Sequence, residues 1–255
     1  MTRMTFETDV TPSTVRVLLI RGFDTDHDSA DGSQTYAAFD AFFSSTDHRR
    51  RHHHTLHHFH YHPDEDLHVV YARLRRHLHR RSYEILIGHS MGGGLLFRYA
   101  TLERPRRIAA YRRLIFLMPL LYRRPIFASF ARHVPGVARL VCPPRCLHVS
   151  LRRHDGAHDG LGRLWEESTR AVGCNQIVQM YNDVMPSTGG AIVDLFRKRP
   201  NAVMLYASDE MLNVIPESIR RRIGTAQCIT VTGKHECFRD ASFAPGFFRR
   251  FHDVV

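Results

Sequence analysis

Lysine is almost missing from this sequence, which contains only Lys198 and Lys234 among 36 basic residues. The remaining 34 (36 − 2) are arginines, and with 25 acidic residues the formal net charge is +11. Arginine is encoded largely by GC-rich codons and lysine by AT-rich codons, so a GC-rich genome would produce this skew without selection for phosphate binding. Coding bias is therefore the preferred interpretation, and a basic surface for nucleic acid is the alternative.

The sequence also lacks a long hydrophobic run and a secretion signal. No stretch reaches the roughly 18 apolar residues of a membrane-spanning helix, and the first ten residues are not a basic segment followed by an apolar one. These absences predict a soluble, cytoplasmic protein. The odd number of cysteines does not fit a disulfide framework and favours a reducing compartment. The five are Cys142, Cys146, Cys174, Cys228 and Cys237.

Metal ligands are present but poorly spaced for a closed site. Cys142, Cys146 and His148 have no second ligand pair nearby, unlike a structural zinc site. Eight of the 19 histidines fall between residues 48 and 62, without a thiolate partner, and this segment is interpreted as a solvated basic loop leading into a short strand. We therefore expect neither a metal nor another cofactor.

The remaining composition, with 255 residues and 43% hydrophobic side chains, fits one large α/β unit. Short apolar runs alternate with helical patterns, which predicts a mostly parallel central sheet flanked by helices. Strands are expected over residues 15–20, 56–62, 83–88, 114–117, 202–207 and 229–232, and helices over 34–45, 63–81 and 90–103. The alternation fails over 122–200, which is predicted to be a helical cap inserted into a core of 1–121 and 201–255.

The strongest chemical signal is the segment Gly88-His89-Ser90-Met91-Gly92, placed between a predicted strand and a predicted helix. A nucleophilic serine benefits from a tight, strained turn that projects its hydroxyl above the sheet, and Gly88 and Gly92 allow close backbone approach there. The first amides of the following helix then face the atom on which negative charge develops. Ser90 is the candidate nucleophile, and an inert turn serine is the alternative.

A serine nucleophile requires a histidine base and a carboxylate that orients the base. His235 follows the last predicted strand, and Asp209 follows the strand before it. Glu210 is the rival of Asp209, which is preferred because of its motif position and because its shorter side chain would hold an imidazole more rigidly. The order Ser90, Asp209, His235 is that of the α/β-hydrolase triad.

With these motifs the chain resembles α/β-hydrolase-fold serine hydrolases from Val15 to its C-terminus. The segment Leu-Leu-Ile-Arg-Gly-Phe-Asp resembles the family's His-Gly loop, with Arg21 in place of the histidine. The resemblance implies an oxyanion hole formed by the backbone N–H groups of Phe23 and Met91. It also implies that the chain starts at the family's third strand and that residues 122–200 form the cap that sets substrate choice.

The expected reaction is cleavage of a carboxylic ester through an acyl-enzyme, with a small-molecule ester or lipid such as a monoacylglycerol or lysophospholipid as substrate. Residues 123–134 place aromatic side chains beside arginines, which suits either an apolar acyl pocket or weak association with an anionic membrane surface. Two other hypotheses remain open: a catalytically silent hydrolase-fold binding protein and a nucleic-acid binder. The second has no recognisable nucleic-acid module in its favour.

Overall fold

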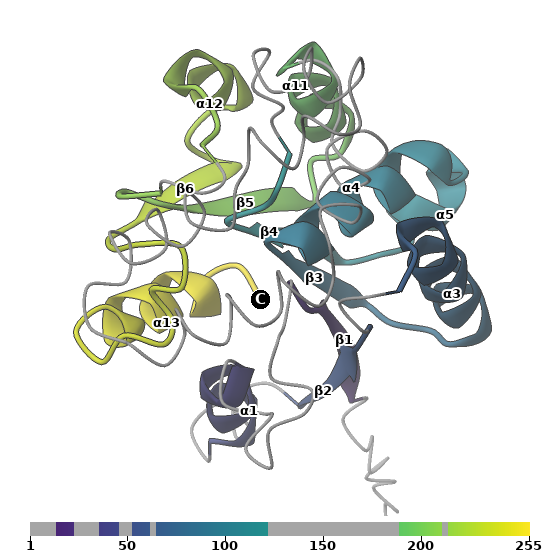
Figure 1. The fold of residues 1–255 in the computed structure, drawn as a ribbon, viewed down its shortest axis with the longest axis horizontal. Helices are drawn as coiled ribbons and strands as arrows, with labels where there is room; N and C mark the ends of the chain where they lie inside the picture. The colour runs from purple at the N-terminus through teal and green to yellow at the C-terminus, as the bar shows by residue number, and fades with distance from the viewer. Residues whose placement is uncertain (1–13, 23–35, 46–52, 62–64, 122–188, 211–213) are drawn as a thin grey trace, which may run out of the picture.

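The computed structural model shows one parallel sheet with helices on both faces (Figure 1). The described residues are 14–22, 36–45, 53–61, 65–121, 189–210 and 214–255. The strands are β1 (Val15–Ile20), β2 (His54–Phe59), β3 (Ile85–His89), β4 (Arg113–Leu117), β5 (Ala202–Ala207) and β6 (Cys228–Val231). The helices are α1 (Ala37–Ser44), α3 (Leu67–Arg80), α4 (Met91–Leu102), α5 (Pro105–Ala109), α11 (Gly189–Lys198), α12 (Glu217–Ile223) and α13 (Ala244–His252).

The six strands have the order β2-β1-β3-β4-β5-β6, and all five pairs are parallel. This confirms the predicted parallel α/β architecture. The chain passes from β1 to β2 on one side and then returns to β3 on the other side of β1. The strand order therefore reverses between β1 and β3, and ligands of open α/β sheets bind in the crevice at such a point, beyond the carboxyl ends of the strands.

Strand β1 shows why a continuous apolar run forms the centre of this sheet. Leu18 and Ile20 belong to the core on one face, whereas Val17 and Leu19 belong to the core on the other. All four side chains are fully buried, as predicted from the uninterrupted hydrophobic sequence. Because the side chains on both faces of β1 are buried, helices must cover both faces of the sheet.

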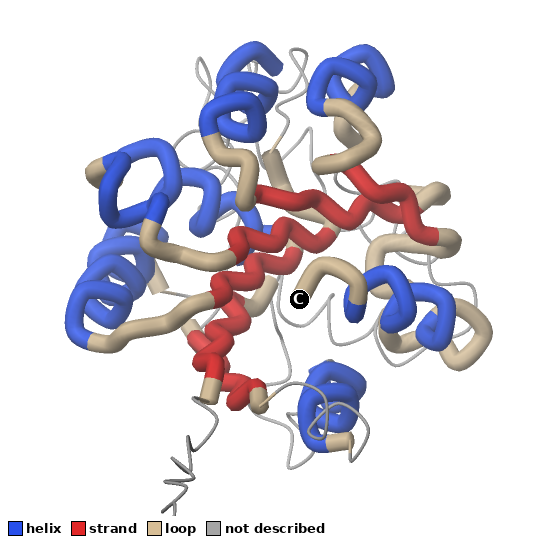
Figure 2. Tube along the Cα trace, turned by 180° about the vertical axis from the view of Figure 1, so that it is seen from behind, coloured by secondary structure: helices blue, strands red, loops and turns tan. Residues whose placement is uncertain are grey.

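The two faces are covered by different sets of helices, which Figure 2 shows on either side of the strands. Helices α1 and α13 cover one face with phenylalanine side chains, and α3, α4, α5, α11 and α12 cover the other. Rings of Phe39 on α1 and Phe251 on α13 lie 5.4 Å apart between their centroids, edge to face. None of the helices in the described ranges is long and apolar enough to cross a membrane.

Helix α3 confirms the predicted amphipathic helix, although it begins at Leu67, four residues later than the expected start at Pro63. The Asp66 side chain accepts hydrogen bonds from the backbone N–H groups of His68 and Val69, which caps the first turn. Basic side chains gather in the last turn, where they interact favourably with the helix dipole.

Helix α11 lies inside the range predicted as the cap, yet it packs on the sheet with the core helices. The Phe196 ring on α11 contacts the Phe116 ring on β4, with 5.4 Å between centroids. Ile192 and Leu195 are also buried in the core of that face. The structure therefore places residues 189–198 with the core, and the rest of the predicted cap, 122–188, lies outside the described residues.

Candidate active site

Ser90 occupies the turn between β3 and α4 in a conformation that few residues adopt. Its φ of 51° and ψ of −116° are strained for a side chain with a Cβ atom. Two hydrogen bonds to the end of β4 and the segment after it hold this backbone: Ser90 N–H donates to the Leu117 carbonyl at 3.0 Å, and the Ser90 carbonyl accepts from Leu120 N–H at 2.8 Å. The conformation is the one that a nucleophile at a strand-to-helix turn requires.

The glycines of the motif are fixed by steric contact. A Cβ atom at Gly88 would lie 2.7 Å from the Gly92 carbonyl oxygen. A Cβ atom at Gly92 would overlap the carbonyl oxygens of Ile20 and Arg21, at the end of β1. Any larger residue would push α4 away from the sheet, so Gly88 and Gly92 are required for the close approach that the sequence predicts.

The end of β1 lies directly against the candidate nucleophile. A Cβ atom built on Gly22 would be 3.0 Å from the Ser90 Cβ atom and 3.1 Å from Nδ1 of His89. Met91, the first residue of α4, is fully buried beside Ser90. These positions suit an oxyanion hole formed by the Met91 N–H and by the residue after Gly22, but Phe23 lies outside the described residues and its role stays a prediction.

The candidate base is held by a buried carboxylate. Nδ1 of His235 lies 2.8 Å from Oε2 of Glu210, and the exposed fractions of the two side chains are 7% and 0%. Glu210 follows β5 and His235 follows β6, so both reach the same edge of the sheet as Ser90 after β3. This is the carboxyl edge at which α/β sheets place their sites.

The carboxylate beside His235 belongs to Glu210, the rival acid, and not to Asp209, the acid preferred from the sequence. The Ser208 and Asp209 N–H groups donate to the Val231 and Gly233 carbonyls at 2.8 and 2.9 Å, which extends the pairing of β5 with the segment after β6. Asp209 is exposed, whereas the next side chain, Glu210, is buried. The longer glutamate then spans the remaining distance to the imidazole.

His89 connects the base to the nucleophile's turn. Its ring lies 5.1 Å from the His235 ring and 5.0 Å from the Phe238 ring, measured between centroids. Burial lowers the pKa of His89 well below its usual value, and the charge of a protonated His235 acts in the same direction. His89 is therefore neutral at pH 7. Because His89 carries no charge, it does not repel the protonated form of His235. A catalytic base must be able to take up a proton in this way.

The described residues hold no cluster of three or more His, Cys, Asp or Glu side chains arranged for a metal ion. Cys228 and Cys237 are separate buried thiols, and burial raises the pKa of these thiols to about 11 and about 12. Cys142, Cys146 and His148, the candidate zinc ligands, lie outside the described residues, as does Cys174.

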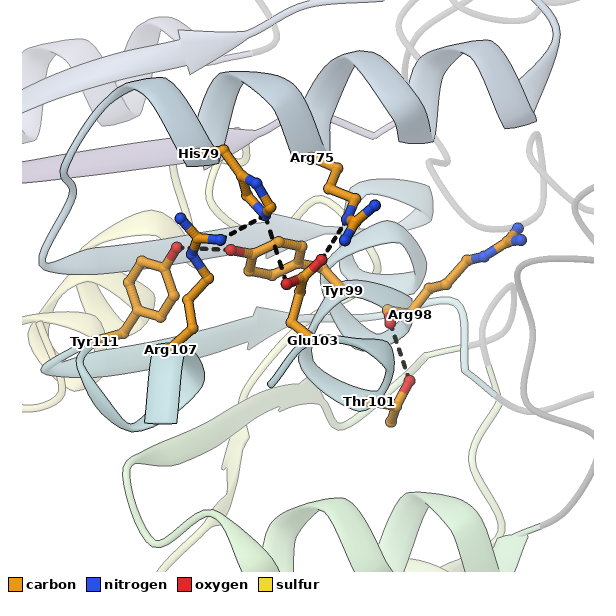
Figure 3. Close-up of polar contacts among 8 residues, drawn as sticks. All are labelled: Arg75, His79, Arg98, Tyr99, Thr101, Glu103, Arg107 and Tyr111. Carbon is orange, nitrogen blue, oxygen red and sulfur yellow. Dashed lines mark hydrogen bonds and ion pairs between the residues drawn. The ribbon is translucent and has the colours of Figure 1, made fainter. Parts of the chain in front are cut away.

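Part of the basic charge is used in local ion pairs between helices, as Figure 3 shows. Glu103, at the end of α4, contacts Arg75 and His79 of α3, the latter at 3.5 Å. Nε2 of His79 also lies 2.8 Å from the Arg107 guanidinium of α5. These contacts join three helices on one face of the sheet, so the side chains involved have a structural role without a nucleic-acid partner.

No protein-family model and no curated protein sequence matches the chain. Its fold, in contrast, is similar to that of several solved enzymes. An esterase from Exiguobacterium antarcticum superimposes with a TM-score of 0.57 at 10% identity, covering 94% of this chain and 91% of the esterase. A haloalkane dehalogenase from Agrobacterium tumefaciens gives 0.56 at 13% identity, covering 94% and 89% of the two chains.

A thioesterase from the prodiginine pathway of Streptomyces coelicolor gives a TM-score of 0.54 at 13% identity, covering 94% of this chain and 90% of the thioesterase. At such low identity the likeness concerns the fold and not the reaction. It agrees with the parallel strand order of the sheet and its flanking helices. The chain has the α/β-hydrolase fold.

Proposed function

We propose that this protein is a serine hydrolase that cleaves carboxylic esters through Ser90, His235 and Glu210. The observation that carries the proposal is the buried contact between Glu210 and His235, at the sheet edge where Ser90 occupies its strained turn. A buried carboxylate that contacts one imidazole nitrogen orients the ring and stabilises its protonated form, as the acid of a triad does for its base. The fold is shared with an esterase and a thioesterase, so it can carry this reaction.

In this mechanism the Ser90 hydroxyl attacks the ester carbonyl while Nε2 of His235 accepts its proton. Glu210 accepts a hydrogen bond from Nδ1–H and stabilises the imidazolium as it forms. The N–H groups of Met91 and Phe23 bind the oxyanion. His235 then protonates the leaving alcohol, which leaves an acyl group on Ser90. A water molecule, deprotonated by His235, releases the acid and restores the serine.

The acyl group is proposed to be apolar, as in a monoacylglycerol or lysophospholipid. The support is the sequence of residues 123–134, in the predicted cap, where Phe127 and Phe130 stand between arginines. A panel of esters with increasing acyl length tests the pocket. Sedimentation with anionic vesicles at low salt tests the membrane part separately, and a protein that stays in the supernatant has no such surface.

A fluorophosphonate probe tests the reaction directly, because it forms a covalent bond only with an activated serine. The wild-type protein is expected to be labelled, and Ser90→Ala is expected to lose both labelling and turnover of p-nitrophenyl butyrate. Ser45→Ala is the matched control, since Ser45 is an exposed serine at the end of α1. A wild-type protein that is not labelled, or a Ser90→Ala variant that keeps its turnover, contradicts the proposal and favours a silent binding protein.

A further inference from the structure

A buried tyrosine joins the end of β1 to the turn that carries the candidate nucleophile. Tyr36 precedes α1, and its hydroxyl oxygen accepts a hydrogen bond from Gly22 N–H at 2.6 Å. The same hydroxyl lies 2.9 Å from Nδ1 of His89. Gly22 lies so close to Ser90 that a Cβ atom built on it would be 3.0 Å from the Ser90 Cβ atom, and His89 is the residue before Ser90. One oxygen atom therefore bridges the two backbone segments that meet at the candidate nucleophile.

The protons of this bridge can be assigned from the surroundings of His89. Because the Tyr36 hydroxyl accepts the Gly22 N–H, its own proton can be donated to Nδ1 of a neutral His89. The His89 proton then resides on Nε2, which is buried. The tyrosine thereby favours one orientation of the ring that lies 5.1 Å from His235.

The Tyr36 ring is itself held by two neighbouring side chains. It stacks on Phe238 with 6.1 Å between centroids and 20° between planes, and the Arg21 guanidinium lies 4.8 Å from its centroid. Arg21 is buried and donates a hydrogen bond from Nε to Nδ1 of His58 at 3.1 Å. Nε2 of His58 in turn lies 2.8 Å from Asp40 of α1.

Arg21 therefore has a defined partner in this chain. It stands at the position where the α/β-hydrolase-fold serine hydrolases that the chain resembles have a histidine. Its side chain connects β2 through His58 to α1 through Tyr36. Its backbone carbonyl accepts a hydrogen bond from the Tyr61 hydroxyl at 2.9 Å. The side chains of Tyr36 and Tyr61 thus hold the end of β1, directly before the predicted oxyanion donor Phe23.

We infer that Tyr36 is a positioning residue of the hydrolase, which fixes Gly22 and His89 relative to Ser90 through its hydroxyl group. The inference rests on the proposed function, because it assigns to Tyr36 an effect on the rate of acyl transfer. Small displacements of a reacting group can reduce the rate about 100-fold. Tyr36 does not need to touch the substrate to act in this way.

Tyr36→Phe removes one oxygen atom and keeps the ring contacts. It is expected to lower kcat for p-nitrophenyl butyrate about tenfold or more, with KM within about twofold, and to slow fluorophosphonate labelling by a similar factor. Tyr99→Phe is the matched control. It removes an equally buried hydroxyl, which lies 3.0 Å from the Tyr111 hydroxyl in the other core, and is expected to leave kcat within about twofold of wild type.

His89→Leu tests the same bridge from its other end, and it carries the test if Tyr36→Phe does not fold. The two substitutions are expected to be non-additive in kcat, because each breaks the same hydrogen bond. Unchanged kcat in a folded Tyr36→Phe or His89→Leu variant of a wild-type protein that is labelled overturns the inference and leaves the proposed function intact. A wild-type protein that is not labelled overturns the proposed function and this inference with it.

Discussion

Glu210 and His235 are 25 residues apart in the sequence, yet Oε2 of the first lies 2.8 Å from Nδ1 of the second, and neither is appreciably exposed. The carboxylate belongs to the chain after β5 and the imidazole to the chain after β6. A buried carboxylate without this partner would be costly. The contact compensates for burying the carboxylate, and it is the most specific chemical feature of the site.

Glu210→Gln is expected to lower kcat for p-nitrophenyl butyrate about 100-fold or more, because the amide no longer stabilises the imidazolium that forms in the transition state. Asp209→Asn is the matched control, since Asp209 is the neighbouring carboxylate and is exposed. It is expected to keep kcat within about twofold. Steady-state kinetics of both variants decide between the acids, and a large loss in Asp209→Asn alone would restore the prediction from the sequence.

Gly92→Ala is expected to reduce the free energy of unfolding by about 2 kcal/mol or more, because the added Cβ overlaps two carbonyl oxygens at the end of β1. Urea denaturation followed by circular dichroism measures the change. Gly246→Ala is the control, since a Cβ atom at this helical glycine of α13 meets nothing within 4 Å. It should raise stability by about 0.5–1 kcal/mol. Equal effects of the two substitutions would show that the close approach of α4 to β1 is unimportant.

Glu103→Gln is expected to lower the melting temperature at pH 7 by about 2–4 °C. Burial alone would raise the pKa of Glu103, but the hydrogen bond and charge of Arg75, with His79, lower the pKa below its usual value. The ionised carboxylate therefore stabilises the fold above the unfolded pKa of about 4.3, and this stabilisation is lost as the pH falls through the folded pKa.

The difference between wild type and Glu103→Gln should consequently shrink in melting curves recorded below pH 4. Glu217→Gln is the control, since Glu217 pairs with Arg221 on the exposed surface of α12. An exposed ion pair contributes little to stability, so the melting temperature of Glu217→Gln should differ from that of wild type by about 1 °C or less. If the difference in melting temperature between wild type and Glu103→Gln does not depend on pH, ionisation of Glu103 is not its cause.

The sequence was sufficient to predict the parallel sheet because its buried strands are continuous apolar runs, as in β1 and β5. Helix α12 was not predicted, although Pro216 before it and Gly224 after it, with a φ of 89°, mark its two ends. Helix α11 was assigned to the cap because the prolines before it obscured where the insertion ends. Only its packing against β4 shows that it belongs to the core.

The candidate nucleophile and base could be predicted because the spacing of Gly88, Ser90 and Gly92 is set by local steric limits and because His235 follows a strand. The choice between Asp209 and Glu210 could not, since it depends on how far the β5–β6 pairing extends beyond the strands. From the sequence, Tyr36 is only a residue within the helix predicted over 34–45. The bond between its hydroxyl and Gly22 depends on a tertiary contact that local sequence does not encode.

The glutamate–histidine pair also determines when the site can appear during refolding. Ser90, Glu210 and His235 follow three different strands, and β4 lies between β3 and β5 in the sheet. Contacts between residues so distant in the chain form slowly, because long loops must close first. A collapsed intermediate that contains only the N-terminal half of the sheet would carry the serine turn without its base, so enzymatic reactivity would return only with the last strands.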